Sequence, residues 1–309
     1  MDSTYRNSAL TIIAAIIVSL VISIALEISV VPPYLHATNR VVNIFDFYEH
    51  IGHNNIYFIG SSQIEYGVDT RIIGQNVYNL GSSADTPLRR LIELNRLIGT
   101  KPRAVIIGLT YFGLNDSSFN VSQADYIAPV ADKIKLDSRD QFTQEELKLI
   151  DSNPIYYNRK FIRGGIFALI HRDQIDQSGS NVTNFTIPGN YAKNCDFKEL
   201  TDTQKGNAQL KNYFVSEKDF RQKHALNYTI YKLRNVGIKV LILNMPLNPL
   251  LSAKISNDTR RNYFNFLNST GAKYYDFETS CPSEYFADLA HLNDGGRKHF
   301  TEKLCQIVQ

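Results

Sequence analysis

Four short segments of the sequence carry residue types that could perform nucleophilic acyl chemistry. Three of them follow short apolar runs, and the fourth lies near the end of the chain. They read Gly60-Ser61-Ser62-Gln63, Gly81-Ser82-Ser83, Gly113-Leu114-Asn115-Asp116 and Asp288-Leu289-Ala290-His291-Leu292-Asn293. A serine hydroxyl is a weak nucleophile until a base takes its proton, and that base needs a partner that holds its tautomer. The four segments contain all three residue types.

Asp288 and His291 are the candidates for the partner and the base. They stand three positions apart, so on a turn the carboxylate can reach one ring nitrogen and leave the other for a serine from elsewhere in the chain. Ser62 is the candidate nucleophile. The negatively charged tetrahedral intermediate also needs fixed donors, and a backbone amide at a glycine turn together with an asparagine side chain can supply them.

Each motif also has a simpler interpretation. Gly-Ser-Ser is a common turn sequence, and Asp-x-x-His also occurs where an aspartate caps a helix beside a surface histidine. The order of the segments and their positions after apolar runs agree with one another, which favours a site. Other histidines have no partner at a recognisable spacing and are interpreted as structural or surface residues, for example His53, His171, His224 and His299.

Five apolar runs predict the strands that would position these segments. They cover residues 56–60, 76–81, 103–109, 238–246 and 273–277. A first helix is predicted within residues 38–54, and another over residues 87–98 with Thr86 as its cap and Pro87 at its first position. Strands that alternate with helices predict an α/β fold whose mainly parallel sheet is covered on both faces. In such a sheet, reactive groups gather at the carboxyl ends of the strands.

The expected organisation is a cytoplasmic stub with a transmembrane anchor, residues 1–35, followed by one α/β domain, residues 36–309. The segment between the third and the fourth predicted strands is far longer than a simple crossover connection needs. We therefore expect an insertion or lid at about residues 117–235.

The four segments, in this order, resemble the conserved blocks of the SGNH or GDSL hydrolase family. The first block of the family has the form Gly-Asp-Ser, and residues 60–62 match it with serine in place of aspartate. The last block has the form Asp-x-x-His, which Asp288 and His291 match. The resemblance implies that Ser62 is the nucleophile of a catalytic triad with these two residues.

The resemblance also implies an oxyanion hole and a fold. Gly81 stands at the glycine of the second block, and Asn115 stands at the asparagine of the third block, Gly-x-Asn-Asp. With the amide of Ser62, these groups would stabilise the oxyanion. The implied fold is the flavodoxin-like three-layer sandwich, with no cofactor and no metal. The serine in the first block is similar to the variant found in membrane-anchored relatives, such as the D-alanyl transfer and alginate acetylation proteins.

An uncharged apolar run at residues 9–25 predicts one transmembrane helix. A helix rises about 1.5 Å per residue, so roughly 20 mainly apolar residues cross a bilayer. A cleaved signal peptide is the main alternative, but residues 35–37 read Leu-His-Ala, with a large residue where cleavage needs a small one. A buried core helix is the other alternative. We expect an uncleaved, single-pass anchor in the lipid bilayer.

Asn-x-Ser/Thr triplets favour an extracytoplasmic position for the domain. One begins at Asn115, and six others mark candidate glycosylation sites. These are Asn120, Asn181, Asn184, Asn227, Asn257 and Asn268. A chain rich in asparagine, serine and threonine also collects such triplets without being glycosylated.

Composition argues against several other classes of protein. The chain is 43% hydrophobic with a net charge of +3 and no dense basic stripe, which argues against nucleic acid as a partner. No glycine-rich phosphate-binding motif follows a predicted strand. Cys195, Cys281 and Cys305 lack the spacing of zinc ligands. In an oxidising compartment, Cys281 and Cys305 are the first pair to test, because they bracket the last predicted helix.

Two functions from different classes remain. The first is a membrane-bound serine esterase or acyltransferase that acts on acyl esters of a cell-surface glycan or a lipid-linked substrate. The second is a catalytically inactive module of the same fold that binds glycans or supports a membrane acyltransferase. Two features motivate it: the serine at position 61, and the position of Asn115 several residues beyond the third predicted strand. A Ser62 hydroxyl within hydrogen-bond reach of the His291 ring would favour the first.

Overall fold

The computed structural model describes residues 12–22, 25, 40–83, 85–114, 139–150 and 220–308. Within these ranges, no helix combines the length and the apolar character that crossing a bilayer requires. The predicted anchor lies partly outside them.

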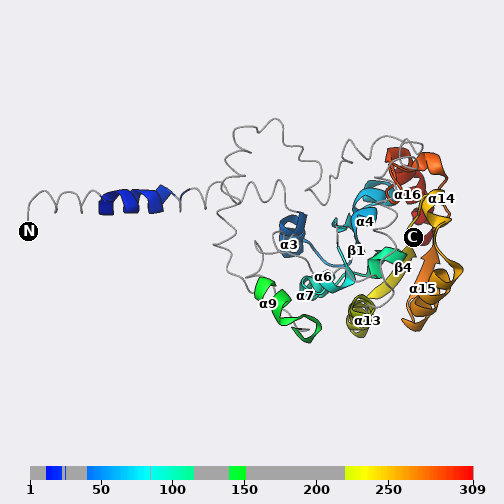
Figure 1. The fold of residues 1–309 in the computed structure, drawn as a ribbon, viewed down its shortest axis with the longest axis horizontal. Coiled ribbons are helices and arrows are strands. Elements are labelled where there is room, and N and C mark those ends of the chain that lie inside the picture. The colour runs from blue at the N-terminus through cyan, green and yellow to red at the C-terminus, as the bar shows by residue number, and fades with distance from the viewer. Residues whose placement is uncertain are drawn as a thin grey trace, which may run out of the picture.

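A parallel sheet of five strands forms the centre of the domain (Figure 1). The strands are β1 (Ile56–Ile59), β2 (Val77–Asn79), β3 (Ala104–Leu109), β4 (Lys239–Asn244) and β5 (Lys273–Asp276). They lie in the order β2-β1-β3-β4-β5, and all neighbouring pairs are parallel. Each predicted run is therefore a strand, and the predicted parallel α/β sheet is confirmed. The order is the flavodoxin-like one, whose switch point lies between β1 and β3.

Helices cover both faces of the sheet because the side chains of each strand alternate between two cores. Tyr57 and Ile59 pack in the larger core, and Ile56 and Phe58 in the smaller one. The larger core includes side chains from α3 (Arg40–His50), α6 (Pro87–Arg90), α7 (Leu94–Gly99), α9 (Gln144–Ile150), α13 (Phe220–Asn235), α14 (Pro249–Ser252) and α15 (Asn257–Ser269). The smaller core includes side chains from α4 (Ser62–Gly67), α5 (Thr70–Ile73) and α16 (Asp294–Val308). Short 3₁₀ turns are η1 (Tyr111–Leu114), η3 (Arg139–Gln141) and η6 (Ser283–Tyr285).

The helix predicted over residues 87–98 is divided into α6 and α7. Thr86 caps α6 as predicted, because its hydroxyl accepts a hydrogen bond from the Arg89 amide (3.2 Å). Between the two helices, the amides of residues 91–94 bond to carbonyls three positions back. This is the tighter 3₁₀ pattern, which the spacing of apolar residues alone does not distinguish from an α-helix.

The predicted insertion at residues 117–235 includes a helix that belongs to the sheet domain. α13 packs against α6 and β4. Its buried side chains lie in the larger core and include Ala225, Leu226, Ile230 and Leu233. α13 is thus the helix that precedes β4 in the chain and packs on the sheet. Residues from Phe220 onward therefore belong to the α/β domain and not to an insertion.

The two cysteines that were the first pair to test both carry free thiols. Cys281 is buried, whereas the Cys305 thiol donates to the carbonyl of Thr301 in its own helix (Sγ to O, 3.4 Å). A disulfide between them is therefore not formed in this structure. Cys195 lies outside the described residues.

Three candidate glycosylation sites fall within the described ranges. Asn227 on α13 and Asn257 and Asn268 on α15 are all exposed. Asn120, Asn181 and Asn184 lie outside those ranges. Exposure is compatible with modification, and glycosylation stays a prediction.

The side chain of Ile64, which is fully buried, holds α4 against the sheet. A Cβ atom added at Gly60 would lie 2.9 Å from Ile64 Cγ1, and one added at Gly81 would lie 2.8 Å from Ile64 Cγ2. At Gly108, an added Cβ would overlap both Cγ1 and Cδ1 of Ile64. These three residues, which we call the glycine seat, leave room for α4 only because they lack side chains.

Gly108→Ala is expected to lower the free energy of unfolding by about 1–3 kcal/mol, because the added methyl group overlaps Ile64. Ile64→Ala leaves a cavity and should cost about 2–5 kcal/mol. The double variant should cost less than the sum, since the smaller side chain removes the overlap. Urea unfolding measures all three, and strictly additive effects would contradict the steric account. Gly99→Ala is the control, because an added Cβ there meets nothing within 4 Å.

Candidate active site

Ser62 lies at the turn between β1 and α4. β1 ends at Ile59, and Gly60 follows with φ +145°, a backbone conformation that other residues rarely adopt. Ser61 caps α4, because its side chain accepts a hydrogen bond from the Gln63 amide. Ser62 is then the first residue of the helix, at the carboxyl end of a central strand.

His291 and Asp288 join Ser62 in one chain of hydrogen bonds. Ser62 Oγ lies 2.7 Å from His291 Nε2, although the two residues are 229 positions apart. His291 Nδ1 lies 2.8 Å from Asp288 Oδ2. The three side chains that the sequence singled out are therefore arranged as a proton relay requires.

The Asp288 carboxylate is fixed by its own loop. Its Oδ1 accepts hydrogen bonds from the amides of Ala290 (2.8 Å) and His291 (2.7 Å). Burial acts to raise the pKa of Asp288, but the hydrogen bonds and charge of His291 and the bonds from these two amides outweigh it, so the pKa is lowered. Asp288 therefore stays ionised and holds the imidazole in one orientation.

The loop that carries the histidine is tied to the helix that carries the serine. The side-chain amide of Gln63 donates to the carbonyl of Ala290 (3.0 Å). Within the loop, the Ala287 amide donates to the carbonyl of His291 (2.8 Å). The neighbour of the candidate nucleophile thus helps to position the candidate base.

A cavity of about 290 Å³ lies beside Ser62 and His291. Much of its wall is apolar and comes from β1, β3, η1 and α13. These side chains include Ile59, Ile107, Leu109, Phe112 and Leu226. Ligand sites commonly measure roughly 300–1,000 Å³, so this cavity suits a small group. Among the described residues, no group of three or more His, Cys, Asp or Glu side chains could hold a metal ion.

Two of the predicted oxyanion donors belong to described residues, and of these Ser62 lines the cavity. As the first amide of α4, the Ser62 amide has no partner within the helix. The Gly81 amide instead donates to Oδ1 of the buried Asn79 (2.9 Å), and Gly81 is not among the described residues that line the cavity. The Gly81 amide, which was the predicted oxyanion donor, is therefore already hydrogen-bonded to the Asn79 side chain. Asn115 lies outside the described residues.

Thr110 is a cavity residue that the sequence analysis missed. It directly follows β3, is 4% exposed and lines the cavity. β1 pairs with β3 so that Ile59 lies opposite Ile107, which places Thr110 beside the turn that carries Ser62. Its signal in the sequence was its position immediately after the third strand, where reactive groups gather.

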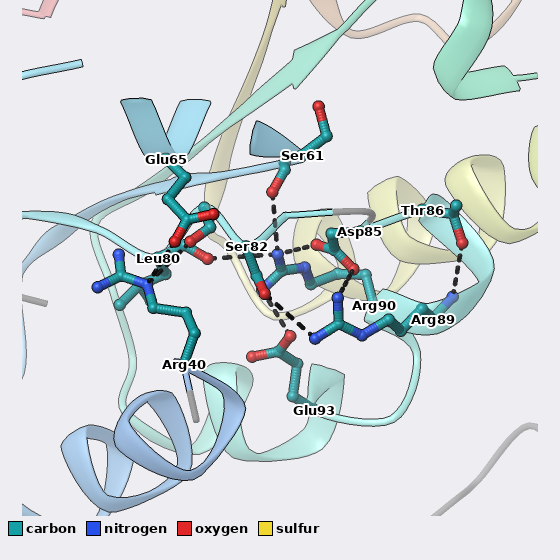
Figure 2. Close-up of polar contacts among 12 residues, drawn as sticks. Arg40, Ser61, Glu65, Leu80, Ser82, Asp85, Thr86, Arg89, Arg90 and Glu93 are labelled. Carbon is teal, nitrogen blue, oxygen red and sulfur yellow. Dashed lines mark hydrogen bonds and ion pairs between the residues drawn. The ribbon is translucent and has the colours of Figure 1, made fainter. Parts of the chain in front are cut away.

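A group of buried charged residues lies close to the segments that follow β1 and β2 (Figure 2). Arg90 forms ion pairs with Asp85 and Glu93. One of its terminal nitrogens also donates to the carbonyl oxygens of Leu80 (3.3 Å) and Gly60 (3.4 Å). Breaking a buried ion pair leaves an uncompensated charge at a high cost. Arg90 therefore holds the segments after β1 and β2 in one arrangement.

Arg40 extends these contacts to α3 and α4. Its guanidinium donates to the carbonyls of Asn79 (2.6 Å) and Gly81 (3.0 Å), and its Nε lies 3.9 Å from Glu65 Oε1 on α4. Burial raises the pKa of Glu65, although the charge of Arg40 acts in the opposite direction. Arg90 and Glu93 stand at a helical spacing of three positions. Arg40 and Glu65 come from α3 and α4, and no spacing in the sequence connects them with the other members of the cluster.

Comparison with known proteins gives a partial match and a distant structural likeness. One protein-family model matches residues 189–309, which is less than half of the chain and includes Asp288 and His291. No curated protein is similar enough to count as a match. A crystal structure of a proposed acylhydrolase from Bacteroides fragilis NCTC 9343 has 10% sequence identity and a TM-score of 0.42, with 85% of this chain and 92% of that chain covered. A likeness at this level does not indicate an activity.

The lowered pKa of Asp288 predicts how stability depends on pH. Because the folded-state pKa lies below the ordinary value of about 3.9, Asp288 stabilises the fold above that pH and loses this contribution as pH falls through the folded-state pKa. Asp288→Asn should therefore lower the free energy of unfolding most near neutral pH, and the difference should shrink below about pH 4. Urea unfolding at a series of pH values measures it. A difference that does not change with pH would contradict the ionised assignment.

Proposed function

We propose that the chain is a serine esterase or acyltransferase of the SGNH type, with Ser62 as its nucleophile. The observation that carries this proposal is the pair of hydrogen bonds that joins Ser62 to His291 and His291 to Asp288, at 2.7 Å and 2.8 Å. Such a chain turns a weakly nucleophilic hydroxyl into an effective nucleophile. The cavity beside it provides room for a small acyl group.

The reaction proceeds in two steps. Ser62 Oγ attacks the acyl carbonyl carbon while His291 Nε2 takes the hydroxyl proton, and Asp288 stabilises the imidazolium that results. The imidazolium then gives this proton to the leaving alkoxide, which leaves an acyl group on Ser62. In the second step, water or a sugar hydroxyl loses its proton to His291 and attacks the carbonyl carbon of the acyl-enzyme. The bond to Ser62 Oγ breaks, His291 returns the proton to this oxygen, and the acid or the new ester leaves.

The oxyanion of each step is stabilised by the Ser62 amide and the Thr110 hydroxyl. Both residues line the cavity. Within the described part of the chain, no side chain or backbone group forms a hydrogen bond with the Thr110 hydroxyl. Thr110 thus takes the role that the sequence analysis gave to Asn115, as a donor placed directly at the end of β3.

The substrate is an acyl ester of a cell-surface glycan or a lipid-linked molecule. The apolar run at residues 9–25 supports a bilayer anchor, and the Asn-x-Ser/Thr triplets support an extracytoplasmic domain. A membrane acyltransferase is the partner that such a location suits. A catalytically inactive, glycan-binding module is the alternative, motivated by the Gly81 amide being occupied by Asn79.

Ser62→Ala is expected to abolish covalent labelling by a fluorophosphonate and to lower the hydrolysis of 4-nitrophenyl acetate by about 10³-fold or more, because the covalent intermediate is lost. Labelling is read by mass spectrometry, which also identifies the modified residue.

Ser61→Ala is the matched control for the adjacent hydroxyl. It should stay labelled, although loss of the cap costs about 1 kcal/mol of stability. Labelling that persists in Ser62→Ala would end the proposal. A folded wild-type protein that is never labelled and still binds polysaccharide would favour the inactive module.

Thr110→Val is expected to lower kcat for ester hydrolysis by about 10²-fold, because it removes an oxyanion donor without changing the volume of the side chain. Thr110→Ser keeps the hydroxyl and should retain most of the activity. Steady-state kinetics of the two variants separate this role from packing. Equal losses of kcat in both variants would assign Thr110 to packing alone.

A further inference from the structure

One wall of the cavity comes from a helix within the region expected to be an insertion. α13 contributes Leu226 and Thr229, which are 1% and 2% exposed, to the cavity lining. Their positions, three apart, place both side chains on one face of the helix. Phe112 and Leu109 contribute apolar surface from η1 and β3. This wall lies beside the nucleophile but takes no part in the proton relay.

Thr229, which lines the cavity, carries a buried polar atom without a partner. Its Oγ1 is buried and forms no hydrogen bond in the described structure. A helical threonine commonly bonds back to the carbonyl three or four positions earlier, and Thr229 does not. A buried hydroxyl without a partner costs roughly 1–3 kcal/mol. Its χ1 has a second favourable rotamer in a helix, so the hydroxyl can turn toward a bound group without movement of the backbone.

The position of α13 is fixed by a buried contact. Oε1 of Gln222, which is 0% exposed, accepts a hydrogen bond from the Leu88 amide of α6 (3.0 Å). α13 also contacts η1. Leu226 and Thr229 follow Gln222 by one and two helical turns, so this contact fixes where their side chains meet the cavity.

We propose that α13 recognises the acyl group of the substrate, which is a short chain that carries a hydroxyl or a similar polar substituent. The inference rests on the proposed function. Leu226 limits the length of the chain, because it lines a cavity of only about 290 Å³. The Thr229 hydroxyl hydrogen-bonds the polar substituent, which supplies the partner that the protein does not provide.

Hydrolysis of two 4-nitrophenyl esters tests the role of Thr229. The wild-type protein should show a higher kcat/KM for the 3-hydroxybutyrate than for the butyrate. Thr229→Val, which keeps the shape and removes the hydroxyl, should lower this ratio by about five- to tenfold. Thr229→Ser is the matched control and should keep the ratio. The ratio is insensitive to a general loss of folded protein, because both esters report on the same sample.

Leu226→Ala tests the limit on chain length. It should raise the ratio of kcat/KM for the hexanoate over the butyrate by about tenfold, since one or two methylene groups are worth this much in an apolar pocket. Both ratios have to change as stated. If the wild-type protein hydrolyses these esters and either ratio stays unchanged in its variant, the role of α13 is overturned while the proposed function stands. A wild-type protein that neither hydrolyses them nor reacts with a fluorophosphonate removes both.

Discussion

The contact of Ile64 with the glycine seat is the constraint on which the rest of the site depends. α4 approaches the ends of three adjacent strands so closely that Gly60, Gly81 and Gly108 cannot carry a side chain. A close-packed interior does not absorb such an overlap without movement of the backbone. Ile64 stands two residues after Ser62, so the position of the seat sets where the candidate nucleophile emerges from the sheet.

The candidate base is positioned by local bonds and then joined to this helix. The Asp288 carboxylate accepts hydrogen bonds from two backbone amides and contacts the imidazole of His291. The pair of Asp288 and His291 therefore forms within one loop. Gln63 then connects that loop to α4 through the carbonyl of Ala290. Behind α4, Arg90 links the carbonyls that follow β1 and β2. The candidate nucleophile lies on α4, and the candidate base lies on a loop that Gln63 of α4 binds. Both groups are therefore held in place before a substrate binds, which is the preorganisation that acyl transfer requires.

The cavity lies at the switch point of the sheet, between the ends of β1 and β3, and α13 forms one of its walls. Strand order places the ends of β1 and β3 side by side, and this is where ligands bind in open parallel sheets. The segments that follow β1 and β3 supply Ser62 and Thr110, which serve the chemistry under the proposed mechanism. α13 supplies Leu226 and Thr229, which suit recognition. A change in α13 can therefore alter the substrate while leaving the proton relay in place.

The sequence by itself determined the strands and the residue types of the candidate site. The strands can be recognised as continuous apolar runs because both faces of a parallel sheet are buried. Asp288 and His291 can be recognised as a pair because they stand only three positions apart. Tertiary structure alone decided that Ser62 meets His291 across 229 positions and that Asn79 occupies the Gly81 amide. It also decided that Thr110, Arg90 and Thr229 border the cavity. The reason is physical: burial and long-range contact depend on how whole elements pack, which no local spacing records.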